Sequence, residues 1–132
     1  MKRLVVLLLV CSPLMLACER EDASTRQVII NINHSKFEPG NIEVPEGSLI
    51  TFVVRNHDPI DHEFIVGDEH IQLVHENGTE AHHGARAGEI SVPAGETRTT
   101  VYSFDEKGSL IYGCHLPRHY DYGMKGSITI TS

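Results

Sequence analysis

The C-terminal part of this 132-residue chain contains the stretch Gly113-Cys114-His115-Leu116-Pro117-Arg118-His119-Tyr120-Asp121-Tyr122-Gly123-Met124. A thiol, an imidazole and a thioether follow one another in it with the spacing C-x4-H-x4-M, at Cys114, His119 and Met124. A β-rich run precedes Cys114, Pro117 bends the chain, and another β-rich run follows Met124. One loop between two strands can therefore direct three metal ligands at the same point.

The chemistry of these three side chains favours copper. Thiolate and thioether sulfur suit Cu(I), and imidazole suits both Cu(I) and Cu(II). The copper geometry used for electron transfer has one Cys, two His and a distant axial Met, so a second His is needed from elsewhere. The candidate is His62, which stands where a loop enters a β-rich run. His57 in the same loop is the alternative.

The rest of the chain predicts an all-β domain, because short apolar-alternating runs are separated by Gly and Pro turns. Ile128 and Ile130, for example, alternate with polar neighbours. The Val-Pro-x-Gly sequences at 44–47 and 92–95 each precede a strand, and residues 105–107 are interpreted as a hairpin turn. We expect an antiparallel Greek-key β-sandwich of about seven to eight strands. Its main runs are 28–32, 49–54, 62–66, 97–104, 109–113 and 127–131.

In these motifs, the sequence from 27 to 131 resembles the cupredoxins, which are the single-domain blue copper proteins. The ligand spacing is most similar to that of the rusticyanin and auracyanin type. The resemblance implies one type 1 copper ion with His62, Cys114, His119 and Met124 as ligands. It also implies that the ring edge of His119 is exposed and serves as the electron port. Glu63 is a departure, because many members of the family have Asn after the first His.

The N-terminus is interpreted as a targeting segment. Residues 1–17 combine Lys2 and Arg3 with an apolar run that is too short to span a bilayer, as in a secretory signal peptide. The residues leading to Cys18 look like a bacterial lipobox, which predicts cleavage before Cys18 and lipidation of this residue. Residues 18–26 would then be a polar tether and 27–132 the cupredoxin domain, exported and anchored on the periplasmic side or the cell exterior.

The net charge of the chain limits the classes of partner that it is expected to bind. The formal net charge of −7 argues against a nucleic-acid binder that relies on a basic surface. An acidic surface suits a partner with a basic docking patch, such as a c-type cytochrome, or a membrane oxidoreductase. We therefore expect a membrane-tethered copper protein that carries single electrons between redox partners and is not itself an enzyme.

Other interpretations remain open at this point. The Cys114-His115 pair also resembles the last copper motif of multicopper oxidases, but the chain has no His-x-His pair and room for one domain. The long insertion 67–88 contains four His residues, and these favour copper storage or delivery as an alternative function. Asp68 is expected to cap a short helix within that insertion. An Ig-like adhesion domain is the non-metal alternative.

Overall fold

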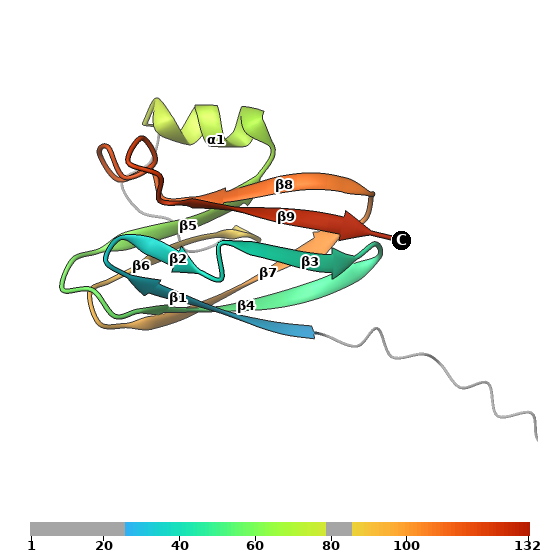
Figure 1. Ribbon diagram of the computed structural model, residues 1–132, viewed down its shortest axis with the longest axis horizontal. Helices are drawn as coiled ribbons and strands as arrows, with labels where there is room; N and C mark the ends of the chain where they lie inside the picture. Colours follow the sequence, from blue (N-terminus) through green and yellow to red (C-terminus); the bar gives the residue numbers. More distant parts are fainter. Residues whose placement is uncertain (1–25, 79–85) are drawn as a thin grey trace, which may run out of the picture.

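The computed structural model describes residues 26–78 and 86–132, which form nine strands and one helix arranged as two packed sheets (Figure 1). The elements, in chain order, are β1 (Arg26–Asn33), β2 (Lys36–Glu38), β3 (Asn41–Pro45), β4 (Ser48–Asn56), β5 (His62–Gly67), α1 (Glu69–Glu76), β6 (Glu89–Val92), β7 (Thr97–Phe104), β8 (Gly108–Gly113) and β9 (Lys125–Thr131).

The strand order confirms the predicted β-sandwich. One sheet has four strands in the order β2-β1-β4-β7, and the other has five in the order β3-β9-β8-β5-β6. Most neighbours are antiparallel, but β1 runs parallel to β4 and β3 runs parallel to β9. The sandwich has more strands than the seven to eight expected. β2 and β6 have only three and four residues, which is too short to give a clear alternation in the sequence.

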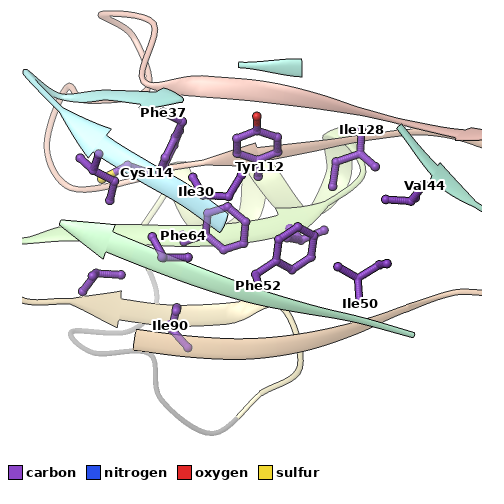
Figure 2. Packing of buried hydrophobic residues seen from close by; sticks show 14 of the residues in the cluster. Ile30, Phe37, Val44, Ile50, Phe52, Phe64, Ile90, Tyr112, Cys114 and Ile128 are labelled. Carbon is purple, nitrogen blue, oxygen red and sulfur yellow. The ribbon is translucent and has the colours of Figure 1, made fainter. Parts of the chain in front are cut away.

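The core lies between the sheets and follows the alternation expected from the sequence. Ile128 and Ile130 of β9 are buried, as predicted. Phe52 from one sheet meets Phe64 from the other, with ring centroids 5.1 Å apart, near the middle of the core (Figure 2). Cys114 belongs to the same cluster and lies at its end (Figure 2). The thiol is therefore held on a rigid, close-packed base.

Two turns agree with the sequence and one does not. The Val-Pro-x-Gly turns place Gly47 and Gly95 at positive φ, 74° and 70°, a conformation that glycine adopts without strain. The hairpin predicted at 105–107 is wrong, because β7 belongs to the four-stranded sheet and β8 to the five-stranded sheet. Residues 105–107 instead carry the chain from one layer to the other.

The helix predicted in the insertion is confirmed. Asp68 is its N-cap, and its side chain accepts a hydrogen bond from the Ile71 backbone N–H. The helix lies on the outer face of the five-stranded sheet, against β5 and β8 (Figure 1). A Cβ on Gly67 would lie 2.5 Å from the Ile71 side chain, so the glycine allows this close approach.

Several predictions concern residues outside those described. They are the signal peptide (1–17), lipidation of Cys18, nearly all of the tether and the part of the insertion with His82 and His83. Within residues 26–78 and 86–132, no helix is both long and apolar enough to cross a membrane.

Candidate metal centre

Three of the predicted ligands converge at one end of the sandwich. His62 is the first residue of β5, Cys114 directly follows β8, and His119 lies in the loop that leads to β9. Cys114 Sγ is 3.9 Å from His62 Nδ1 and 3.3 Å from His119 Nδ1. One ligand atom from each of the three residues lies within 4.8 Å of the other two. His62 and the ligand loop, which begins 52 residues later at Cys114, therefore present two nitrogens and a sulfur to one point.

The fourth predicted ligand closes the loop. Met124 is buried, with 1% of its surface exposed, directly before β9. Its backbone N–H donates to the His119 carbonyl at 3.0 Å, and the Cys114 N–H donates to the Met124 carbonyl at 3.2 Å. These two hydrogen bonds tie the backbones of Cys114, His119 and Met124 together, so the loop holds its shape through the protein alone.

The Asp58 carboxylate fixes the orientation of the His62 ring. A carboxylate accepts hydrogen bonds, so His62 Nε2–H donates to Asp58 Oδ2 at 2.9 Å and Nδ1 faces the sulfur without a proton. Burial lowers the pKa of His62, which keeps the ring neutral as a metal ligand requires. Asp58 was not predicted from the sequence. The available signal was its position four residues before His62, at the other end of the same loop.

Asp58 is itself held by the backbone. The N–H groups of His34 and Ser35 donate to its two oxygens, each at 2.7 Å. Burial tends to raise the pKa of Asp58, but these backbone hydrogen bonds together with the contact to His62 outweigh it and hold the pKa below its usual range. The alternative ligand His57 is exposed and its Nε2 contacts Asn31 Oδ1 at 3.2 Å, so it does not join the cluster.

The Cys114 sulfur is buried and receives a backbone hydrogen bond. Burial raises the pKa of the Cys114 thiol to about 11, although the Glu63 N–H donates to the sulfur at 3.3 Å and opposes this effect. The thiol therefore keeps its proton at neutral pH, and a bound metal ion must displace it. Successive side chains of a strand point to opposite faces, so the Glu63 side chain points away from the face that carries His62. Glu63 nevertheless acts on the sulfur in two ways, because its backbone N–H lowers the pKa of the Cys114 thiol and the charge of its carboxylate raises this pKa.

The donor set fits copper. The converging group has two imidazole nitrogens and a thiol, which copper prefers, and it contains no carboxylate. Met124, whose backbone is hydrogen-bonded to Cys114 and His119, would add a thioether. The two rings differ in exposure, because His62 is 1% exposed whereas His119 is only partly buried. His119 is thus the ligand that lies nearer to solvent.

Among the described residues, the His residues of the insertion do not form a second group of this kind. His70 is exposed on α1, and His82 and His83 lie outside the described residues. His75 is buried, with Nδ1 at 2.8 Å from the Ile71 carbonyl and Nε2 at 3.6 Å from Glu89. In the part of the chain that the structure describes, His62, Cys114 and His119 are the one group of three or more such ligands that converge.

Comparisons with known proteins agree with this geometry. The family model for the cupredoxin-like domain matches residues 4–130. The copper-resistant cuproprotein CopI of Rubrivivax gelatinosus is 30% identical over 115 residues, which cover 83% of this chain and 70% of that protein.

Two solved structures share the fold at lower identity. Auracyanin from Roseiflexus castenholzii is 20% identical with a TM-score of 0.68, over 82% of this chain and 98% of that one. The multicopper oxidase mgLAC is 19% identical with a TM-score of 0.59, over 81% of this chain and 39% of the oxidase. At these identities, the likeness extends to the fold alone.

Proposed function

The chain belongs to the family of cupredoxin-like domains, and from this premise we propose that it is a carrier of single electrons with one copper ion bound by His62, Cys114, His119 and Met124. The observation that carries the proposal is the convergence of Cys114 Sγ with the Nδ1 atoms of two His residues. Copper, when bound, supplies a one-electron couple between Cu(I) and Cu(II). The chain contributes the binding, the geometry and the surroundings.

The protein residues favour a ligand geometry that changes little with oxidation state. Asp58 holds the His62 ring, and the loop hydrogen bonds hold Cys114 and His119 before any metal arrives. The buried surroundings exclude water from the sulfur. A site that is already arranged needs little movement of its ligands when an electron enters or leaves, which is what rapid electron transfer requires.

The more exposed ligand, His119, is the proposed electron port. The net charge of −7 suits a redox partner with a basic docking patch, such as a c-type cytochrome, or a membrane oxidoreductase. The lipobox-like sequence before Cys18 supports export and a lipid anchor, which would keep the domain close to membrane-bound partners. We assign the chain no catalytic reaction of its own.

Copper binding in resistance is the second candidate function. It is favoured by the name of the Rubrivivax relative, a copper-resistant cuproprotein. The same four ligands would then store copper and release it to an acceptor instead of passing electrons. The two candidates differ in whether the metal stays bound when the protein meets a competing Cu(I) acceptor.

Stopped-flow kinetics separate the two candidates. The copper-loaded, reduced protein is mixed with oxidised cytochrome c at rising salt concentration, and copper loss to a Cu(I) chelator is followed in parallel. An electron carrier should reduce the cytochrome quickly at low salt, slow down steeply as salt screens the charges, and retain its copper. Slow reduction together with rapid copper loss would contradict the carrier function and favour the resistance function.

A further inference from the structure

Two residues next to the proposed ligands turn away from the metal centre and pack on each other. His115 follows Cys114 and Tyr120 follows His119. Their rings stack with centroids 4.7 Å apart and an interplanar angle of 23°. The stack links the segment that carries Cys114 to the segment that carries His119. A shift of one ring therefore changes its packing against the other.

Gln72 of α1 connects this stack to the two strands that lead to the centre. It is buried, with 2% of its surface exposed. Its side-chain Nε2 donates to the carbonyl of Ile65 in β5 and to that of Ile111 in β8, each at 3.1 Å. Because β5 begins with His62 and β8 leads into Cys114, one amide group bridges the strands that present both ligands.

The remaining polar atom of Gln72 is directed at His115. With both N–H groups of the amide donating, Oε1 is the acceptor, so His115 Nε2–H donates to it at 2.7 Å. The other ring nitrogen of His115, Nδ1, is 2.7 Å from Glu76 Oε2. Gln72 and Glu76 are four residues apart and share one face of α1. The helix therefore presents an acceptor oxygen to each nitrogen of the ring that follows Cys114.

Gly113 gives an independent sign that this contact constrains the loop. A Cβ at Gly113 would lie 2.9 Å from Gln72 Oε1 and 2.7 Å from the Tyr120 ring. A side chain at position 113 would therefore displace Gln72 or Tyr120, which occupy its space beside Cys114. The residue before Cys114 is thus matched to the presence of Gln72.

We propose that Gln72 is a positioning residue of the copper centre, which acts through His115 and the His115–Tyr120 stack to hold Cys114 and His119 in place. The inference rests on the proposed copper site and adds a role for α1. Without the hydrogen bond from His115 to Gln72, the stack is free to shift, and the distribution of positions of Cys114 Sγ and His119 Nδ1 widens. Electron exchange then requires larger ligand movements.

The test replaces Gln72 while keeping its volume. Gln72→Leu removes all three hydrogen bonds, and His115→Phe keeps a ring to stack on Tyr120 but removes the hydrogen bonds to Gln72 and Glu76. Leu73→Ala is the matched control, because Leu73 is 61% exposed on the same helix. Each copper-loaded protein is examined by visible absorption, by electron paramagnetic resonance and by the rate of electron self-exchange. Thermal unfolding of each variant reports its stability separately.

The expected result is a changed spectrum and slower exchange in both variants. The Cu(II) resonance should broaden, and self-exchange should slow by about 10-fold, the lower end of the effects known for groups that support metal ligands. Leu73→Ala should match the wild type in both measurements. If Gln72→Leu does not fold, the spectrum and exchange rate of His115→Phe alone test the proposal.

Two results would overturn the inference, and they are distinguishable from failure of the proposed function. Variants that lose stability but keep the wild-type spectrum and exchange rate would show that Gln72 is only structural. Variants identical to wild type in every measurement would show that it has no role. If the wild type itself lacks an intense thiolate-to-copper band, the proposed copper site fails and the role of Gln72 fails with it.

Discussion

The ligand loop has His residues on both of its sides, but only the inner side resembles a metal site. On the inner side, the Nδ1 atoms of His62 and His119 face the sulfur of Cys114. On the outer side, both ring nitrogens of His115 face acceptor oxygens, on Gln72 and Glu76. The rings of His75 and His115 are 5.8 Å apart between centroids, yet they join no converging group of three such ligands in the described residues.

The comparison teaches that the direction of the donor atoms matters more than the number of His residues. A ring nitrogen that already contacts a protein acceptor has to give up that contact before it can bind a metal ion. On the inner side, Asp58 takes only Nε2 of His62 and leaves Nδ1 directed at the sulfur. Hydrogen bonding by the protein thus leaves one nitrogen of His62 available for a metal ion, whereas both nitrogens of His115 already face protein oxygens.

The largest effect on the proposed copper site is expected when the Cys114 sulfur is removed. Cys114→Ser should abolish the intense visible thiolate-to-copper band completely, because serine supplies no thiolate. The measurement is absorption after addition of one equivalent of Cu(II). His70→Ala is the control, since His70 is exposed on α1 and should leave the band unchanged. A band that persists in Cys114→Ser would mean that Cys114 is not the ligand.

The next change removes one imidazole from the inner side. His62→Ala should lose the type 1 absorption and recover part of it when free imidazole is added, because the substitution leaves an open position next to the sulfur. His57→Ala, five residues earlier in the same loop and exposed, should behave as wild type. The reverse pattern, with His57 required and His62 dispensable, would contradict the assignment.

A smaller effect is expected when the support of His62 is weakened. Asp58→Asn should lower copper affinity by about 10-fold, because the carboxylate no longer holds the ring. Loss of the nearby negative charge should also raise the reduction potential, as measured by voltammetry. Asp105→Asn is the control, since Asp105 is an exposed carboxylate between β7 and β8 whose side chain accepts a hydrogen bond from the Ser103 hydroxyl. An unchanged affinity and potential in Asp58→Asn would show that Asp58 has no part in the site.

The smallest effect is expected on the outer side. His75→Gln should leave the copper stoichiometry and the visible spectrum as in the wild type, because His75 is not part of the converging group. Metal analysis and absorption of the purified variant check this. A drop in bound copper would assign a metal-binding role to the outer side and support the storage function.

The sequence predicted those parts of the site that one stretch of chain encodes. The spacing of Cys114 and His119 and the strand that begins at His62 indicated the residues that now converge. The core residues of β9 followed from period-two alternation. These features depend on local spacing, which the sequence displays directly.

The parts that escaped prediction depend on contacts between distant segments. The role of Gln72 could not be predicted from the sequence, because its hydrogen-bond partners lie up to 43 residues away. They are Ile65, Ile111 and His115. The wrong hairpin at 105–107 has a similar origin, since turn composition does not reveal which sheet receives the next strand. Lipidation of Cys18 remains a prediction from the sequence.

The proposed copper site can be tested by titrating the purified wild-type protein with Cu(II) and following its visible absorption. We expect an intense band that grows linearly with Cu(II) and stops at one equivalent, because one copper ion binds Cys114. Pale, weak absorption, or copper uptake that continues past one equivalent without such a band, would contradict the inner site and move copper binding to the outer His residues.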